Sequence, residues 1–166
     1  MRELSWEEFA LLARGLAETL GARGVDAVVG VARGGLFAAT AVACALRCEL
    51  YPSRITRRFQ DQVVHETPVW KVPVAPDVAG KTVAVIDDVV DTGETLALLG
   101  EEVRRLRATR VVTAALVAHT WAQPGPDVAA LTSDEFFIFP WDREVLIDGA
   151  WQQHPEIAAA LKMLEG

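Results

Sequence analysis

Residues 83–96, with the sequence VAVIDDVVDTGETL, constrain the fold of this chain more than any other stretch. Four apolar residues lead directly into Asp87 and Asp88, and a third carboxylate, Asp91, precedes a turn built from threonine and glycine. A short apolar run bounded by turn residues is typical of a strand that is buried on both faces of a parallel sheet. The segment therefore predicts a strand over residues 82–86, a polar loop at its carboxyl end and a helix over residues 94–107.

Strands and helices alternate along the rest of the chain. Ser5 and Glu8 have the spacing of a capping box, which predicts a helix from Ser5 to about Leu20. Further strands are predicted over residues 26–32, 49–55 and 110–118, and further helices over residues 34–47 and from about Pro155. Residues 56–80 are polar and contain three prolines, which predicts a long loop or a loose hairpin. The alternation predicts an α/β fold with a doubly wound, mainly parallel sheet and flanking helices.

Composition sets the class of protein and argues against several partners. At 166 residues, 51% of them hydrophobic, the chain is long enough for a single domain, residues 1–166, with one buried core. No stretch approaches the ~20 apolar residues of a membrane span, and acids stand near the amino terminus where an export signal is basic. We therefore expect no membrane partner and a cytoplasmic location. The net charge of −7 disfavours nucleic acid, because both surfaces would be negative.

Two predicted strand ends carry groups suited to a phosphorylated sugar. Backbone N–H groups at the start of the helix predicted from residue 94, with the hydroxyls of Thr92 and Thr95, suit a phosphate monoester. Asp87 and Asp88 would repel that phosphate but suit sugar hydroxyls or a divalent metal. A phosphate beside a diol predicts a ribose 5-phosphate.

The other strand end, VGVARGGL at residues 29–36, presents Arg33 and two glycines at a helix start. This pattern predicts a second anion site, because glycines permit close approach of the backbone to a ligand. The alternative interpretation is a tight turn that packs the helix closely on the sheet. Two anion sites on one sheet edge favour a ligand with phosphates at both ends.

These motifs resemble those of the type I phosphoribosyltransferases. Residues 83–96 resemble the family's phosphoribosyl pyrophosphate signature, VGVARGGL is similar to the pyrophosphate loop of the purine-salvage members, and FFIFPWDREV resembles their base-binding segment. The resemblance covers most of residues 5–145 and implies the type I phosphoribosyltransferase fold, with a mobile loop at residues 56–80 and a small hood at residues 119–150. It implies Mg²⁺-dependent transfer of a 5-phosphoribosyl group from phosphoribosyl pyrophosphate to a 6-oxopurine such as xanthine, guanine or hypoxanthine. It also implies a homodimer or homotetramer.

The resemblance assigns the donor site residue by residue. Asp87 and Asp88 would bind the ribose hydroxyls, directly or through Mg²⁺, and Arg33 and Gly34 would contact pyrophosphate beside a cis peptide bond between Ala32 and Arg33. Four residues would hold the 5′-phosphate: Thr92, Gly93, Glu94 and Thr95. In catalysis, Arg33 would stabilise the leaving group and Asp91 would accept a proton from the base. Asp91 could instead be a structural cap of its loop.

The same resemblance places the base. Phe136 would stack on the purine, and the backbone of Phe137 and Ile138 would bind its edge. The phenylalanine, tryptophan and proline residues of this segment could instead be ordinary core. Where the purine-salvage members have a lysine that donates to the 6-oxo group, the aligned residue is His119. A neutral histidine donates from one ring nitrogen and accepts at the other, so the preference for 6-oxopurines is open.

Two further interpretations concern the loop and the class of protein. Arg57, Arg58 and Lys71 could add positive charge beside pyrophosphate or could be solvated, and His65 is expected to be exposed. The alternative function, which the replacement at His119 leaves open, is a non-catalytic regulatory module that binds phosphoribosyl pyrophosphate or a nucleotide.

Overall fold

The computed structural model describes residues 1–56, 58–59, 62–63 and 68–164. Contacts divide the chain into two compact units. One is Leu11–Asp134, and the other combines Met1–Ala10 with Glu135–Gly166. The hood predicted at residues 119–150 is therefore shared between the two units.

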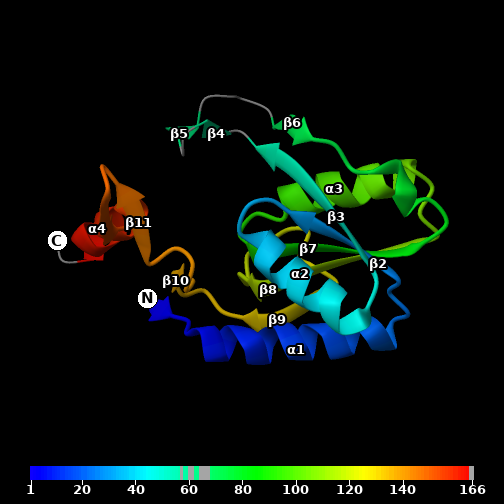
Figure 1. Ribbon diagram of the computed structural model, residues 1–166, viewed down its shortest axis with the longest axis horizontal. Helices are drawn as coiled ribbons and strands as arrows, with labels where there is room; N and C mark the ends of the chain where they lie inside the picture. Colours follow the sequence, from blue (N-terminus) through cyan, green and yellow to red (C-terminus); the bar gives the residue numbers. More distant parts are fainter. Residues whose placement is uncertain (57, 60–61, 64–67, 165–166) are drawn as a thin grey trace. The chain divides into compact units, whose positions relative to one another are not determined.

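The first unit is built on a six-stranded sheet (Figure 1). The strands, in spatial order, are β6 (Val69–Val72), β3 (Glu49–Thr56), β2 (Ala27–Val31), β7 (Thr82–Val90), β8 (Arg110–Ala118) and β9 (Val128–Thr132). All neighbouring pairs are parallel except β3 and β6, which are antiparallel. The predicted α/β fold with a mainly parallel sheet is confirmed.

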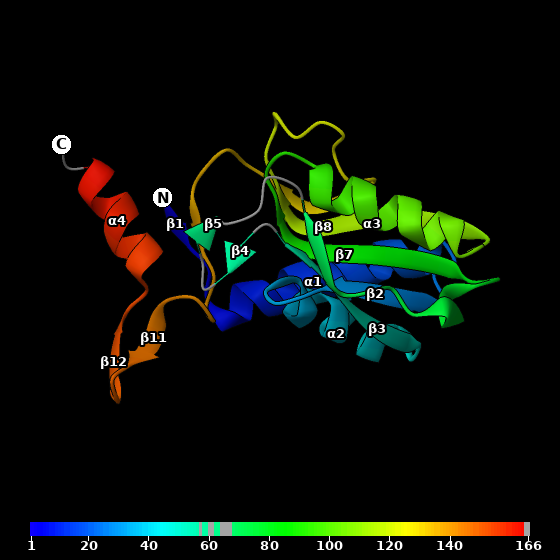
Figure 2. The ribbon, with the colours of Figure 1, turned by 90° about the horizontal axis from the view of Figure 1, so that it is seen from above.

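Helices cover both faces of this sheet. Figure 2 shows α2 (Gly35–Leu46) and α3 (Glu94–Arg105) on opposite faces. The central strands are apolar along their length because neither face meets water, and Val29 of β2, Val85 of β7 and Leu116 of β8 are fully buried. This core holds the carboxyl ends of the central strands in a fixed register.

Helix α1 (Trp6–Ala22) begins at the predicted capping box. Glu8 N–H donates to Ser5 Oγ at 3.1 Å, and Ser5 N–H donates to Glu8 Oε2 at 2.9 Å.

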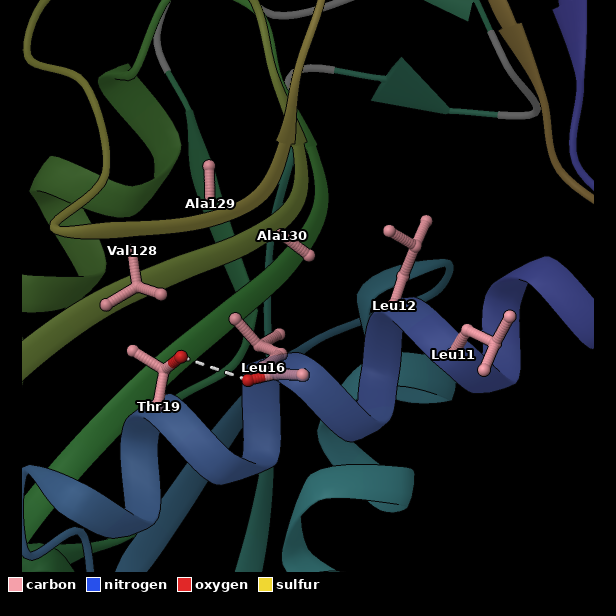
Figure 3. A pocket seen from close by; sticks show the side chains of 8 residues that line it. Leu11, Leu12, Leu16, Thr19, Val128, Ala129 and Ala130 are labelled. Carbon is pink, nitrogen blue, oxygen red and sulfur yellow. Dashed lines mark hydrogen bonds between the residues drawn. The ribbon is translucent and has the colours of Figure 1, made fainter.

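Farther along the same helix, Leu16 of α1 and Val128 of β9 line a hollow of about 270 Å³ (Figure 3). None of the helices in the described residues has the length and apolar character that a membrane crossing needs.

Several element boundaries differ from the sequence prediction. Strand β7 continues to Val90 instead of ending at Ile86, because β8 pairs with it along that length, with Asp87 opposite Ala115. Helix α3 ends at Arg105 rather than at residue 107. Strand β9 and the hairpin of β11 (Glu144–Ile147) and β12 (Ala150–Gln153) were not predicted.

Residues 56–80 include a loose antiparallel arrangement, one of the two forms expected. Strand β3 pairs with β6, and β4 (Arg58–Phe59) pairs with β5 (Gln62–Val63), ahead of a short 3-10 turn at Pro76–Val78. Lys71 is exposed on β6. Arg57, His65 and the side chain of Arg58 lie outside the described residues, so their predicted roles stay predictions.

The second unit joins the two ends of the chain. Strand β1 (Arg2–Glu3) pairs in parallel with β10 (Phe137–Ile138), and α4 (Pro155–Leu164) follows the β11–β12 hairpin. Phe139 and Trp141 are stacked with ring centroids 4.8 Å apart, and Phe9 meets Trp141 edge-on at 5.4 Å. Part of the aromatic segment is therefore core of this unit, as the alternative interpretation of that segment held.

Candidate active site

The carboxyl ends of β2 and β7 bring the two predicted motifs together. The strands are parallel neighbours, so the loop after β2 and the acids of β7 lie at one edge of the sheet. A Cβ atom on Gly34 would overlap Oδ2 of Asp88 and lie 2.8 Å from its Cγ atom. A Cβ atom on Gly35 would lie 2.8 Å from Oδ1 of Asp87. Side chains at both positions would displace the acids, which explains the paired glycines.

Asp87 and Asp88 are half-buried neighbours of like charge. Burial raises the pKa of Asp87 well above its usual range, and repulsion from Asp88 raises it further. Burial also raises the pKa of Asp88. Backbone N–H groups orient both side chains: Asp88 N–H donates to Asp87 Oδ1 at 2.9 Å, and Val89 N–H donates to Asp88 Oδ1 at 2.8 Å. The arrangement suits a cation or a pair of hydroxyl donors, since either favours the ionised carboxylates.

Arg33 lies in the loop between β2 and α2, where it is exposed. Its peptide bond with Ala32 is cis, as the resemblance implied. Ala32 N–H donates to the Ser53 carbonyl oxygen at 2.8 Å, which ties the loop to β3. An arginine next to the amino terminus of α2 gives this loop the positive potential that an anion requires.

Residues 91–95 connect β7 to α3 through a turn that requires glycine. Gly93 has φ +88°, and a Cβ atom there would overlap the carbonyl oxygen of Pro124. Glu94 N–H, at the start of α3, donates to Thr92 Oγ1 at 3.4 Å. The turn places Thr92 and Thr95 at the amino terminus of a 12-residue helix, where N–H groups and the helix dipole favour an anion.

A second loop, residues 119–124, is hydrogen-bonded to the end of β7 and to the loop of residues 91–95. His119 N–H donates to the Val90 carbonyl oxygen at 3.0 Å, and Gln123 N–H donates to that of Thr92 at 3.0 Å. The chain after β8 therefore lies directly beside the candidate phosphate loop.

Asp91 is held by a residue that the sequence interpretation missed. Trp121 Nε1–H donates to Asp91 Oδ1 at 2.8 Å. Trp121 is 53% exposed and stacks on His119, with ring centroids 4.4 Å apart and planes at 18°. A carboxylate accepts several hydrogen bonds, so Asp91 keeps capacity for a ligand proton. The available signal was an aromatic residue two positions after His119, directly beyond a buried strand.

The structure changes the interpretation of His119. Its Nδ1 atom lies 2.8 Å from the carbonyl oxygen of Ser133. A carbonyl oxygen only accepts, so Nδ1 carries the proton and Nε2 of the neutral ring is an acceptor. With Nδ1–H donating to Ser133, the neutral ring has no second N–H to offer a ligand, and the preference for 6-oxopurines stays a prediction. Only the imidazolium form donates from Nε2.

The three predicted base-binding residues of the aromatic segment belong to the second unit. Phe136 is 46% exposed, whereas Phe137 and Ile138 are buried. The carbonyl oxygens of Phe136 and Ile138 accept from the N–H groups of Arg2 and Leu4, each at 2.9 Å. Phe136 thus has a free surface for stacking, and part of the neighbouring backbone is engaged within the unit.

The phosphoribosyl transferase domain family matches residues 4–148. The chain belongs to the phosphoribosyltransferase family. This phosphoribosyltransferase is 30% identical over 147 residues to the xanthine-guanine phosphoribosyltransferase of Cereibacter sphaeroides, a match that spans 84% of this chain and 85% of the relative.

Two further phosphoribosyltransferases are similar to most of this chain. The xanthine-guanine phosphoribosyltransferase of Nitratidesulfovibrio vulgaris is 29% identical over 145 residues, spanning 86% of this chain and 85% of the relative. The solved purine phosphoribosyltransferase from Pyrococcus horikoshii is 30% identical and superimposes with a TM-score of 0.77, covering 89% of this chain and 97% of its own. The protein is an enzyme of the phosphoribosyltransferase class, with the type I fold that the sequence motifs predicted.

Proposed function

We propose that this phosphoribosyltransferase transfers the 5-phosphoribosyl group from phosphoribosyl pyrophosphate to a purine base and releases pyrophosphate. The observation that carries the proposal is the meeting of the Arg33–Gly34 loop with Asp87 and Asp88 beside the loop of residues 92–95. These elements correspond in chemistry to the three polar parts of the donor: pyrophosphate, ribose diol and 5′-phosphate.

In the proposed reaction, Arg33, Asp91 and Trp121 have different roles. The bond between the anomeric carbon and a pyrophosphate oxygen breaks, and a bond from that carbon to a ring nitrogen of the base forms. Arg33 and the amino terminus of α2 stabilise the negative charge that grows on the leaving pyrophosphate. Asp91 accepts the proton that the base loses, while Trp121 keeps the carboxylate in position.

Magnesium fits the residues at the donor site. Asp87 and Asp88 offer adjacent oxygen ligands, and the described residues contain no group of three or more metal-ligating side chains. Such a pair suits Mg²⁺, which keeps several waters and takes further oxygens from substrate phosphates. Bound there, Mg²⁺ would neutralise charge on the donor and relieve the repulsion between the two carboxylates.

The acceptor that we propose is a 6-oxopurine such as xanthine, guanine or hypoxanthine. Relatives that match most of this chain are named for xanthine and guanine, and the solved relative is named for purines. The exposed ring of Phe136 offers a surface on which a purine can stack.

The deciding experiment supplies phosphoribosyl pyrophosphate, Mg²⁺ and each nucleobase in turn, and measures nucleotide by chromatography. We expect nucleotide from at least one 6-oxopurine. Donor binding measured by calorimetry in the same buffer separates the alternatives. Binding without nucleotide from any base would favour a regulatory module, and absence of millimolar or tighter binding would reject both functions.

We propose a homodimer or homotetramer that acts in the cytoplasm without a nucleic-acid partner. Light scattering on the purified protein measures the mass of the assembly, and a monomer under assay conditions would contradict the first part.

A further inference from the structure

Residues 119–127, the supporting loop, run beside residues 90–93 at the end of β7. Three of the contacts are hydrogen bonds of 2.8 to 3.0 Å and the fourth is close packing; in chain order they join His119 to Val90, Trp121 to Asp91, Gln123 to Thr92 and Pro124 to Gly93. The supporting loop therefore lies against both the proposed proton acceptor and the turn of the candidate phosphate loop.

Two threonine–aspartate pairs hold the two ends of the supporting loop. At its far end, Thr113 of β8 donates to Asp127 Oδ2 from N–H at 2.8 Å and from Oγ1–H at 3.0 Å. Asp127 N–H donates back to Thr113 Oγ1 at 3.0 Å. At its near end, Thr120 donates to Asp134 from N–H at 2.8 Å and from Oγ1–H at 2.7 Å, and these bonds lower the pKa of Asp134. Hydrogen bonds to carboxylates are stronger than those between neutral groups, so each pair fixes its end of the loop.

Packing contributes little at the far end of the supporting loop. Residues 123–125 are exposed. Pro124 and Gly125 line a hollow of about 250 Å³ together with Leu96 and Ala97 of α3. Among the contacts of the described residues, hydrogen bonds rather than buried side chains therefore hold this part of the loop in place.

We propose that Thr113 and Asp127 are positioning residues for the 5′-phosphate of the donor. By fixing the far end of the supporting loop, they keep Pro124 against the turn at Gly93. A turn that is held in place before the donor arrives does not have to be ordered on binding, so the pair increases the affinity for phosphoribosyl pyrophosphate. The inference rests on the proposed function, because it concerns the donor site of that reaction.

The Thr120–Asp134 pair has the same chemistry but a different consequence. Thr120 directly precedes Trp121, whose indole N–H holds Asp91. Loss of this pair therefore releases the proposed proton acceptor and leaves the phosphate turn in place. Two chemically similar pairs thus act on different steps, one on donor binding and the other on turnover.

The test measures donor affinity and kcat in parallel for Thr113→Val and Thr120→Val. Valine keeps the branched shape and the backbone N–H bond to the carboxylate but loses the hydroxyl. Calorimetry with phosphoribosyl pyrophosphate and Mg²⁺ gives the Kd of the donor, and turnover at saturating donor and purine gives kcat. We expect Thr113→Val to weaken donor binding by about 2- to 30-fold with little change in kcat. Thr120→Val should lower kcat by a similar factor with little change in Kd.

Further variants complete the design. Thr113→Ser and Thr120→Ser retain the hydroxyl, so each should recover most of what the corresponding valine variant loses. Asp127→Ala, at an exposed position, should weaken donor binding as Thr113→Val does, and it replaces that variant if the valine protein does not fold. Thr109→Val is the matched control, because Thr109 is exposed directly before β8, at the edge of the sheet opposite the site. This control should keep the Kd and kcat of the wild type.

The outcomes separate the inference from the function on which it rests. Wild-type donor affinity in both Thr113→Val and Asp127→Ala overturns the inference and leaves the proposed function standing. Equal changes of Kd and kcat in Thr113→Val and Thr120→Val, or the same loss in Thr109→Val, would show a purely structural role and also overturn it. A wild-type protein that neither binds the donor nor forms nucleotide rejects the proposed function and the inference together.

Discussion

Replacing Gly34 by alanine tests whether the contact between the glycine loop and Asp88 serves donor binding. Gly34 has φ −58° and ψ −42°, angles that alanine adopts without strain. The consequence of the change is therefore steric. The new Cβ atom would overlap Oδ2 of Asp88 and lie 2.8 Å from its Cγ atom, so the carboxylate must move.

The magnitude follows from the size of this collision. Inserting one methyl group into a well-packed site costs about 1–3 kcal/mol. If Asp88 is displaced from the ribose diol or its Mg²⁺, the affinity for phosphoribosyl pyrophosphate should fall by about 5- to 150-fold, since about 1.4 kcal/mol is one factor of ten. The same collision should lower the free energy of unfolding by up to about 1–3 kcal/mol, offset in part because alanine at the start of α2 restricts the unfolded chain.

Calorimetric titration of Gly34→Ala with phosphoribosyl pyrophosphate and Mg²⁺ measures the affinity. Gly15→Ala is the matched control, because Gly15 lies on the exposed face of α1 and no heavy atom would lie within 4 Å of its Cβ. The control should bind the donor as the wild type does and gain about 0.5–1 kcal/mol of stability. Wild-type affinity in Gly34→Ala would refute the placement of the donor against Asp88.

Three further predictions concern the same edge. Asp91→Asn should lower kcat by about 10²–10⁴-fold with little change in donor affinity, and near wild-type turnover would make Asp91 a structural residue. Asp87→Asn should stabilise the ligand-free protein at neutral pH while weakening donor binding. Because burial raises the pKa of Asp87 in the folded protein, the wild-type carboxyl contributes its full stability below its unfolded-state pKa and loses it as pH rises through the folded-state pKa. The stability gained by Asp87→Asn, measured by urea titration, should therefore be largest at neutral pH and shrink toward acid pH. Gly93→Ala should lower the free energy of unfolding by about 2–5 kcal/mol, because the residue has a positive φ and its new Cβ atom would collide with Pro124. Gly80 also has a positive φ, +75°, but open space around it, so Gly80→Ala should lose only about 1–2 kcal/mol in the same unfolding assay.

The sequence alone determined the elements and the donor motifs, because their signals are local. A buried strand of a parallel sheet is a continuous apolar run in the sequence, so β2, β7 and β8 could be located from residues that are adjacent in the chain. The capping box of Ser5 and Glu8 spans one helical turn and was equally visible. The loop of residues 91–95 carried its turn glycine and hydroxyls within a few positions. Strands β11 and β12 escaped prediction because each has only four residues, too few for a clear hydrophobic period, and β12 is exposed throughout.

Only the tertiary structure decided how the side chains of this edge meet. The contact of Gly34 with Asp88 and the bond from Trp121 to Asp91, 30 residues apart, join loops that follow different strands. The tautomer of His119 depends on a carbonyl group 14 residues away. Such contacts are set by strand order and register, which bring the carboxyl ends of separate strands to one edge and which no local pattern of residues encodes.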